Sequence, residues 1–491
     1  MHRSAREYGE SWRGSPYSGF LVCEGECGEA GDVGDSDTIA AIATAIGEAS
    51  IAVIRVSGSR SLSIVDRIFR GSVPLQTAPS HTVWHGWIVH MDSGAHIDEV
   101  LATVMRAPRT YTTEDVVEIG CHGGTQPAQA ILLELLRAGA RLAEPGEFTK
   151  RAFLGGRVDL AQAEGVMELI GAQTMAGKDA ALRQVEGSLT RFISALRQNI
   201  IELMAHIEVT IDYPEHDVED ATALVVKEGV TQLRRELRDL LATAVSGRVL
   251  KTGIRTVIVG RPNVGKSSLL NQLARAERAI VTDIPGTTRD VVEEGVQISG
   301  IPLRVLDTAG IRETTDVVER LGVMRSRQAI KDADLLLIVI DASRALEKED
   351  RELLALASSL PAVVVLNKMD LPALITVEAI SKYVVCEHIV PYSVFRPEML
   401  QNLEQAVLRV VFGGELRVRD ATFLANARHL SLLEEAGACL DQVLESVEMG
   451  VTLDLAAVDL HQAWVTLGEI IGETPREDLL DQIFSQFCLG K

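Results

Sequence analysis

The sequence predicts a multidomain protein of mixed α/β and α class, in which a domain with a mostly parallel sheet interrupts a helical domain. Three observations support this fold class. The 491 residues exceed the usual size of a single domain. An apolar run at 254–259 leads through a glycine-containing loop into a helical pattern, as in parallel α/β sheets. Helical periodicity lies on both sides of that segment, at about 156–249 and 416–491.

The N-terminal part of the chain changes character at residue 37. Residues 1–36 are rich in Gly, Ser, Glu and Arg without a repeating pattern, and we expect them to be disordered. Residues 37–155 combine apolar runs with one helical stretch, which predicts an α+β domain. The expected strands lie at 38–42, 50–56, 100–105 and 116–119, and the expected helix at 129–138.

The helical domain is expected in two parts, because an inserted domain separates them. Apolar residues recur every three or four positions from Leu182 to Ile207, which predicts one long amphipathic helix that ends before Pro214. The ends of such an insertion must lie close together, which is common for compact domains. The expected parts are 156–249 and 416–491, with the insertion at 250–415 and further helices at about 221–247, 430–444 and 453–471.

Residues 260–268 read GRPNVGKSS, which has the spacing of a phosphate-binding loop. Gly260 and Gly265 let successive backbone N–H groups point at an anion. Lys266 is expected to contact the β and γ phosphates, and Ser267 to offer a hydroxyl group to Mg2+. The alternative is a glycine-rich turn without a ligand, and two further motifs count against it.

The first of these motifs follows an apolar run at 303–306. It consists of Asp307, Thr308, Ala309 and Gly310. The aspartate can hold Mg2+ through water, and the N–H of Gly310 can meet a γ-phosphate.

The second motif, Asn367-Lys368-Met369-Asp370, follows another apolar run. The Asp370 carboxylate can accept hydrogen bonds from both N1–H and N2–H2 of guanine, a donor pair that adenine lacks. Ser393 and Val394 occupy the place of the last guanine loop. Together the motifs resemble the translation-factor class of P-loop GTPases.

The hydrolytic machinery departs from that of the small regulatory GTPases. Ile311 stands where a glutamine usually orients the attacking water, and its side chain cannot hydrogen-bond. The polar candidates nearby are Arg312, Glu313 and Glu319. Hydroxyl groups in the segment 282–290 can close on Mg2+ when the γ-phosphate is present. Arg289 in this segment is either a solvated loop cation or a catalytic one.

Composition restricts the partners and the compartment. The net charge of −21 makes a poor phosphate-binding surface, so a basic partner is expected to hold most of any bound RNA; simple solubility is the alternative. No 18-residue apolar run and no signal peptide are found, so we expect no membrane span. Six scattered cysteines suit a reducing, cytoplasmic location.

Motifs from all parts of the chain beyond residue 37 resemble the MnmE (TrmE) family of tRNA modification GTPases. They are DTI at 37–39, RVSG at 55–58, CHGG at 121–124, PGEFTKRAFL at 145–154, DLAQAE at 159–164 and FCLGK at 487–491. The resemblance implies an N-terminal domain that binds folate and dimerises, a split helical domain and an inserted GTPase domain.

The resemblance also implies a reaction. The family works as a homodimer with a flavin-containing MnmG-type partner in a heterotetramer, where FAD is bound by the partner only. Together they add a carboxymethylaminomethyl group to C5 of the wobble uridine, position 34, of certain tRNAs. A 5,10-methylene- or 5-formyl-tetrahydrofolate donates the one-carbon unit, and glycine supplies the amine. GTP hydrolysis drives a conformational cycle, and K+ makes two G domains dimerise in place of an arginine finger.

Residue roles carry over by position. The resemblance implies K+ ligands at Asn263, Thr282, Ile284 (backbone) and Thr287, and Mg2+ ligands at Ser267 and Thr288. Catalytic roles fall on Lys266, on Glu319, which would orient the attacking water, and on Cys488, which is either a catalytic thiol or a small apolar packing residue. The remaining expected GTP-binding residues are Val264, Gly265, Ser268, Asp283, Pro285, Gly286, Asp307, Thr308, Ala309, Gly310, Asn367, Lys368, Asp370, Ser393 and Val394.

The implied folate-binding residues are Arg55, Glu118, Arg157 and Lys491. Cations suit the glutamate tail of folate, and a carboxylate suits pterin N–H donors. The alternative for Arg55 and Glu118 is an ordinary ion pair. Arg157 stands where the family often has lysine. The loop at 44–50 replaces one that is usually rich in Pro, Arg and Gly, and it has no cation. For His122 we favour a structural loop over catalysis.

A second function fits the GTPase motifs equally well. A GTP-driven switch that binds ribosomal RNA or assembly factors would need the same nucleotide site but no one-carbon chemistry. A third possibility is a scaffold regulated by GTP. The folate-site residues and the C-terminal sequence CLGK favour the tRNA-modifying enzyme.

Overall fold

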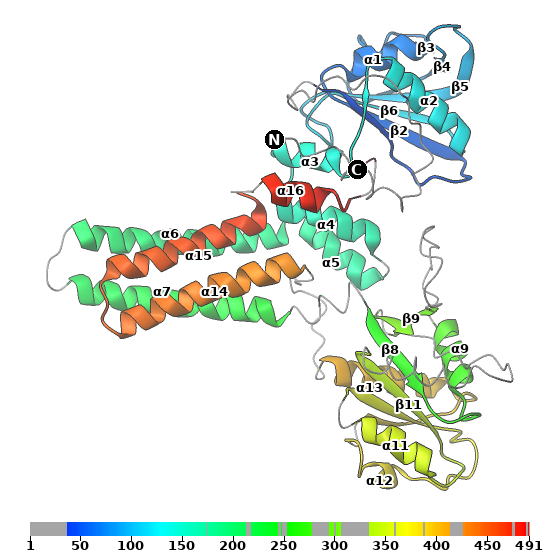
Figure 1. The fold of residues 1–491 in the computed structure, drawn as a ribbon, viewed down its shortest axis with the longest axis vertical. Helices are drawn as coiled ribbons and strands as arrows, with labels where there is room; N and C mark the ends of the chain where they lie inside the picture. Colours follow the sequence, from blue (N-terminus) through cyan, green and yellow to red (C-terminus); the bar gives the residue numbers. More distant parts are fainter. Residues whose placement is uncertain are drawn as a thin grey trace, which may run out of the picture.

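The computed structural model shows an N-terminal α+β domain, a helical domain and a G domain with a mostly parallel sheet, which confirms the expected fold class (Figure 1). It describes residues 37–172, 174–212, 218–243, 247, 253–276, 294–298, 301–305, 333–357, 360–385, 388–412, 426–473, 477–487 and 490. The expected disorder of residues 1–36 and the expected switch segment at 282–290 lie outside these ranges.

The N-terminal domain is built on a seven-stranded sheet with the order β3-β4-β5-β6-β2-β1-β7, antiparallel except for the pair β1–β7. The strands are β1 (Ile39–Ile42), β2 (Ile51–Ser57), β3 (Phe69–Gly71), β4 (Thr82–Val89), β5 (His96–Met105), β6 (Val116–His122) and β7 (Arg141–Leu142). The helices are α1 (Ser61–Ile68), α2 (Thr125–Arg137) and α3 (Glu147–Leu154). The buried side chains of α1 and α2 pack on one face of the sheet.

All four expected strands and the expected helix of this domain are present, with longer bounds for β5, β6 and α2. The sequence did not predict β3, β4, β7, α1 or α3. β4 alternates covered and exposed positions from Thr82 to Ile88, but Val83 and Trp87 are exposed and Gly86 is covered, so the apolar residues do not follow the alternation. This mixed pattern hides a strand from a search for regular alternation.

The helical domain combines two segments that lie far apart in the sequence. α6, α7, α14 and α15 form a four-helix bundle in which each helix packs against two others (Figure 1). Buried leucines such as Leu196, Leu233, Leu440 and Leu460 fill its centre. The helices of the domain are α4 (Leu160–Gly171), α5 (Met175–Val185), α6 (Ser188–Asp212), α7 (Val218–Ala242), α14 (Ala427–Glu448), α15 (Leu453–Ile471) and α16 (Glu477–Phe484).

The single long helix expected between Leu182 and Ile207 is wrong. The chain forms two helices, α5 and α6, which are separated at Gly187, where φ is +79°. Glycine adopts this left-handed conformation at little cost, and it ends the helix. Leu182 is exposed on α5, although its spacing fits the stripe of α6.

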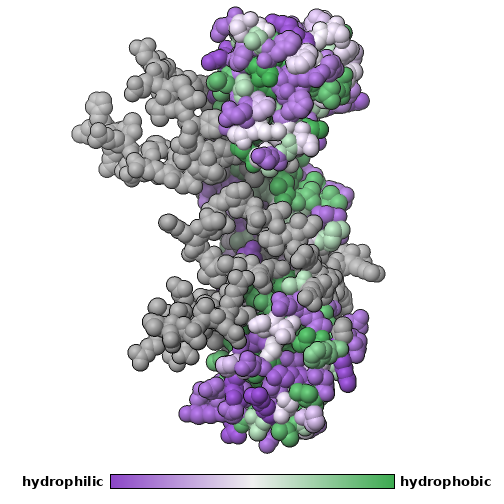
Figure 2. Space-filling model, turned by 90° about the vertical axis from the view of Figure 1, so that its right-hand side faces the viewer, coloured by the Kyte–Doolittle hydropathy of each residue, from purple (hydrophilic) through white to green (hydrophobic). Residues whose placement is uncertain are grey.

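Apolar side chains gather at the height of α4 and α5 in the space-filling view (Figure 2).

The G domain has a six-stranded sheet with the order β13-β12-β11-β8-β10-β9, parallel except for the pair β9–β10. Its strands are β8 (Ile254–Val259), β9 (Glu294–Ile298), β10 (Ile301–Val305), β11 (Leu335–Asp341), β12 (Ala362–Asn367) and β13 (Ile389–Pro391). Its helices are α9 (Lys266–Ala276), α11 (Lys348–Leu356), α12 (Val377–Ile380) and α13 (Leu400–Phe412), with a 3-10 turn at Pro397–Met399.

The G-domain sheet positions the candidate nucleotide site. β11 and β12 are buried along their whole length, and β8 runs parallel to β11. Neighbouring parallel strands end at the same edge of a sheet. The loops that follow β8 and β12 therefore meet there. Among the described residues, none of the helices combines the length and the apolar content that crossing a bilayer requires.

Candidate functional site

The loop between β8 and α9 has the backbone of a phosphate-binding turn. Gly260 and Gly265 have φ values of +156° and +101°, and a Cβ atom at Gly265 would overlap the side chain of Asn367. Asn263 adopts the left-handed conformation with φ of +63°. Glycine and asparagine tolerate such values better than other residues. The loop then passes directly into α9 at Lys266.

Side-chain donors occupy the carbonyl groups of this loop. Lys266 Nζ donates to the carbonyl oxygens of Gly260 and Arg261, each at 2.8 Å. From the loop after β12, Lys368 Nζ donates to Asn263 O and Asn367 Nδ2 to Val264 O, also at 2.8 Å. With its carbonyl groups engaged on these donors, the loop keeps backbone N–H groups for an anion.

Lys266 is the cation of the loop. Burial lowers the pKa of its ammonium group below the usual value. In the part of the chain that the structure describes, no carboxylate lies within ion-pair distance of it. A bound phosphate would supply the missing counter-charge and stabilise the charged form.

The expected base-binding loop is held together by buried polar contacts. Ser393 is fully buried and its hydroxyl group donates to Asp370 Oδ1 at 2.6 Å. Asn367 is almost fully buried, and its Oδ1 atom has no hydrogen-bond partner among the described residues. A buried acceptor without a donor is costly, so this atom suits a ligand or a water molecule.

Asp341 is a residue of this site that the sequence did not reveal. It ends β11, and its Oδ2 atom accepts from Lys368 Nζ at 2.6 Å. Burial alone would raise the pKa of Asp341, but hydrogen bonds from Lys368 and Ser343 hold it below its usual value. Asp341 therefore fixes the lysine that also holds Asn263 of the phosphate-binding loop. A carboxylate at the end of a buried strand was the available signal.

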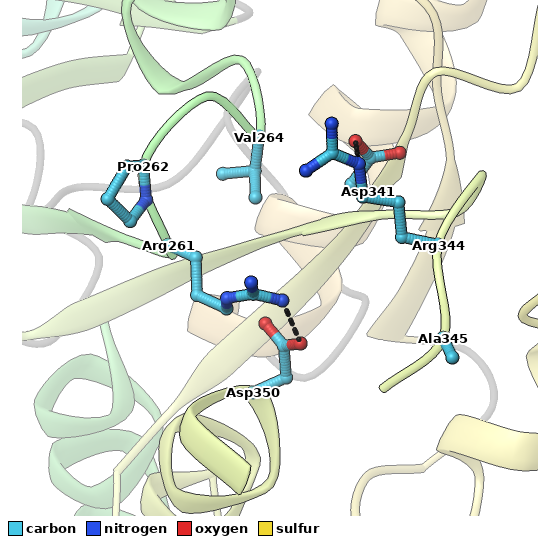
Figure 3. A pocket seen from close by; sticks show the side chains of 7 residues that line it. All are labelled: Arg261, Pro262, Val264, Asp341, Arg344, Ala345 and Asp350. Atoms are coloured by element: carbon cyan, nitrogen blue, oxygen red, sulfur yellow. Dashed lines mark hydrogen bonds and ion pairs between the residues drawn. The ribbon is translucent and has the colours of Figure 1, made fainter. Parts of the chain in front are cut away.

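A small cavity lies behind the phosphate-binding loop (Figure 3). Arg261 Nη1 approaches Asp350 Oδ2 at 3.3 Å, and Arg261 Nη2 approaches Glu347 Oε1 at 2.6 Å. The cavity has a volume of about 10 Å3, which suits one water molecule and is too small for a nucleotide. These ion pairs tie the start of the loop to α11. The lining residues are Arg261, Pro262, Val264, Asp341, Arg344, Ala345 and Asp350.

In the N-terminal domain, Arg55 and Glu118 face each other across β2 and β6. Arg55 Nη2 lies 2.8 Å from Glu118 Oε1, so the two residues do form an ion pair. Arg55 also lies over the ring of Tyr111 at 5.3 Å, and Arg157 lies over the same ring at 4.9 Å. Tyr111 thus brings three of the expected folate-site residues together.

Tyr111 is the second residue that the sequence did not reveal. The Arg55 guanidinium group also lies 5.6 Å from the ring centre of Phe148, so it is flanked by two aromatic rings. Flanking rings stabilise a guanidinium group by cation–π attraction. The available signal was an aromatic residue in a polar loop of a chain with only 4% aromatic residues.

The C-terminal tail reaches the same domain. Phe484 and Phe487 pack together, and a Cβ atom at Gly146 would overlap the backbone of Phe484. Gly490 lies against Ile42 at the end of β1. Ile42 is next in the chain to Ala41, which pairs with Arg55 of β2. The structure therefore places residue 490 near the Arg55–Glu118 pair.

Several expected site residues lie outside the described residues. Their expected roles remain predictions from the sequence. They are Thr282, Asp283, Ile284, Pro285, Gly286, Thr287, Thr288, Arg289, Asp307, Thr308, Ala309, Gly310, Ile311, Arg312, Glu313, Glu319, Cys488 and Lys491.

The CHGG loop at 121–124 shows structural contacts. The ring of His122 bonds to Asp98 Oδ1 at 2.7 Å, and this hydrogen bond raises the pKa of the imidazole. Burial raises the pKa of the Cys121 thiol to about 11, which keeps it protonated and unreactive at neutral pH. A Cβ atom at Gly123 would overlap the backbone of Ala49.

A parallel sheet that carries a glycine-rich phosphate loop beside an Asn-Lys-x-Asp loop defines the class of P-loop GTPase domains. Two family models match the chain: "GTP-binding protein TrmE N-terminus" over residues 38–157 and "MnmE helical domain" over 160–488. The chain belongs to the MnmE family of tRNA modification GTPases.

Curated relatives agree over nearly the whole chain. The tRNA modification GTPase MnmE of Geobacillus thermodenitrificans is 51% identical, covering 93% of this chain and 99% of that protein. The protein of the same name from Bacillus cereus is 49% identical with the same coverage. A crystal structure of a variant of Aquifex aeolicus Era bound to GDP.AlF4- is 31% identical, covering 38% of this chain and 66% of that chain with a TM-score of 0.26.

Proposed function

We propose that this chain is a K+-dependent GTPase that works with a flavin-containing MnmG-type partner to modify the wobble uridine of tRNA. The observation that most directly supports this proposal is that one chain holds two separate sites. A guanine-nucleotide loop system lies in the inserted domain, and a cationic and aromatic site lies beside the C-terminal tail in the N-terminal domain.

In the nucleotide site, Lys266 would bind the terminal phosphates, and Asp370, oriented by Ser393, would bind guanine. Ser267 lies next to Lys266 in the first turn of α9, which suits a Mg2+ ligand when paired with Thr288. Mg2+ bound there would neutralise charge that develops on the phosphates. Glu319 would orient the attacking water, a task that Ile311 cannot perform.

The K+ site would use Asn263, Thr282, the Ile284 carbonyl and Thr287. Oxygen ligands of this kind suit a hard monovalent cation. The backbone of Asn263 fits the role, because Lys368 holds its carbonyl group in a left-handed turn. Bound K+ would supply positive charge beside the departing phosphate.

The N-terminal site would bind a tetrahydrofolate derivative. Arg157 and Lys491 would attract the glutamate tail, and Glu118 would accept hydrogen bonds from pterin N–H groups. The Arg55–Glu118 ion pair supports this assignment, because Arg55 presets the carboxylate and Tyr111 offers a ring surface for stacking. We propose Cys488 as the thiol that the tail would bring to this site.

The organisation follows from the same proposal. The functional units would be residues 37–155, 156–249 joined with 416–491, and 250–415. The N-terminal domain would form a homodimer, and the dimer would bind the flavoprotein in a heterotetramer in the cytoplasm. FAD would belong to the partner alone.

A comparison of KCl with NaCl at equal ionic strength tests the GTPase assignment. We expect the GTPase rate of the full chain to be at least about tenfold higher in KCl, because the cation contributes transition-state charge stabilisation. Asn263→Ala is expected to remove most of this difference. Equal rates in the two salts would refute K+ dependence.

Nucleoside analysis of tRNA from a strain that lacks this chain tests the modification itself. We expect the carboxymethylaminomethyl group to disappear from wobble uridines and to return with the wild-type chain. Unchanged tRNA, together with defective ribosome assembly, would support the alternative of a GTP-driven assembly switch.

A further inference from the structure

The two ends of the four-helix bundle differ in their connections. One end carries all the connections to the rest of the molecule. There α5 precedes α6 and α16 follows α15, while α7 leads into the G domain and α14 returns from it. At the other end the chain only passes from α6 to α7 and from α14 to α15. We call this second end, comprising 201–212, 218–229 and 445–459, the distal end. It points away from the N-terminal domain and the G domain (Figure 1).

The distal end exposes large apolar side chains. Met449 is 77% exposed, Leu224 64% and Val209 60%, and Leu455 and Val458 are exposed as well. The opposite halves of the same four helices expose no large apolar side chain among their described residues. Exposed apolar side chains that cluster on one surface often mark an interaction site, whereas singly scattered ones are normal. The other half of the bundle serves as an internal comparison with the same fold.

The charge of the distal end is also distinctive. Its sequence holds ten Asp and Glu residues against one Lys, and that Lys227 is paired with Glu448 at 2.9 Å. Glu208, Asp212 and Asp454 are exposed there. The other half of the bundle, comprising 188–200, 230–242, 427–444 and 460–471, balances its charges, with six Arg residues against six Asp and Glu. The distal end therefore combines apolar contact area with negative charge.

We propose that the distal end is a docking surface for a protein partner whose matching surface is basic and carries apolar side chains. Opposite charge would steer such a partner and suppress wrong ones, and the apolar groups would provide contact energy. Nucleic acid does not fit, because its phosphates would face uncompensated carboxylates. A second copy of the distal end would face the same repulsion.

The test rests on the proposed function in one respect, because the probe is the flavin-containing partner protein. The full-length chain carries Leu224→Gln with Val458→Gln, or Glu208→Lys with Asp454→Lys. Glutamine keeps helix propensity while it removes apolar contact. The control is Ala438→Gln, an exposed position in the other half of α14. Circular dichroism checks that each variant is folded.

We expect each of the two double variants to weaken flavoprotein binding at least about tenfold. The Glu208→Lys and Asp454→Lys variant is also expected to lower the association rate and the salt dependence of that rate. The control is expected to bind like the wild type, and the GTPase rate to stay unchanged in all variants. Wild-type affinity in both distal pairs would overturn the docking surface while leaving the partnership intact. Loss of tRNA binding or of self-association instead would also overturn it. If the wild type does not bind the flavoprotein, the partnership fails and the docking surface with it.

Discussion

At the scale of single residues, the base-binding loop also shapes the phosphate-binding loop. Lys368 and Asn367 follow one another at the end of β12, and their side chains donate to the carbonyl groups of Asn263 and Val264. Asp341 holds Lys368 from the neighbouring strand. A change in either loop is therefore transmitted to the other through single hydrogen bonds.

Ser393→Ala tests whether Asp370 of the base-binding loop depends on a buried hydrogen bond. The buried Ser393 hydroxyl group donates to Asp370, and loss of a hydrogen bond to a charged group costs about 1.5–3 kcal/mol. We expect GDP affinity, measured with a fluorescent GDP analogue, to fall about tenfold or more. Ser381→Ala, which removes an exposed hydroxyl group in the same domain, serves as the control. An affinity within twofold of the wild type would show that Asp370 needs no support from Ser393.

At the scale of elements, a buried polar network joins the two parts of the helical domain. Glu164 on α4 accepts from Arg428 Nη2 and His429 Nε2 on α14, each at 2.7 Å. Arg428 Nη1 also donates to the carbonyl oxygen of Glu469 in the last turn of α15. This network fixes the point at which the chain re-enters the bundle after the G domain.

The pH dependence of stability tests the network. Burial alone would raise the pKa of Glu164, but His429 and Arg428 lower it from 4.5 to about 2. A lowered carboxylate pKa stabilises the folded state above pH 4.5, and this stability is lost as the pH falls from 4.5 toward 2. The shift corresponds to roughly 3 kcal/mol. We expect the protection of α14 amides against hydrogen exchange, relative to their intrinsic exchange rates, to fall across this window.

Glu164→Gln should remove that dependence. Because Arg428 would lose its carboxylate, we expect the variant to be about 3 kcal/mol less stable at about pH 7. We also expect the protection of α14 amides to lose most of its pH dependence between about 5 and 3. Glu434→Gln, an exposed change on α14, is the control. An unchanged pH profile in Glu164→Gln would assign the acid sensitivity to another carboxylate.

At the scale of the whole molecule, α16 connects the helical domain with the N-terminal domain. Leu480, Phe484 and Phe487 pack against Leu160 and Ala163 of α4. Lys150 of α3 and Asp481 of α16 form an ion pair of 2.6 Å. These contacts deliver the C-terminal tail to the end of β1.

Phe484→Ala tests whether α16 positions the tail. Removing a buried Phe costs about 3–5 kcal/mol, enough to loosen this short helix. We expect the affinity for 5-formyl-tetrahydrofolate, measured by calorimetry, to fall at least about tenfold while the GTPase rate stays constant. Ser485→Ala on the exposed side is the control. Unchanged folate affinity would show that the tail contributes nothing to that site.

Local patterns predicted most of the elements but not their breaks. The apolar spacing around Leu182 continues in phase across Gly187, so periodicity alone could not show that two helices meet there. Likewise, the sequence placed Arg55 and Glu118 in one site only by resemblance to a family. Their pairing depends on the register between β2 and β6, and Tyr111 enters from a separate loop.

The amino-acid sequence by itself determined the class of nucleotide chemistry, because motif spacing sets both the local backbone and the groups it presents. The glycines and Lys266 of the first loop and Asp370 of the second needed no tertiary information to be recognised. Only the tertiary structure decided which of these groups hold one another, how the tail reaches β1, and which end of the bundle remains uncovered. Those outcomes depend on strand order and packing between segments far apart in the chain, which no local pattern encodes.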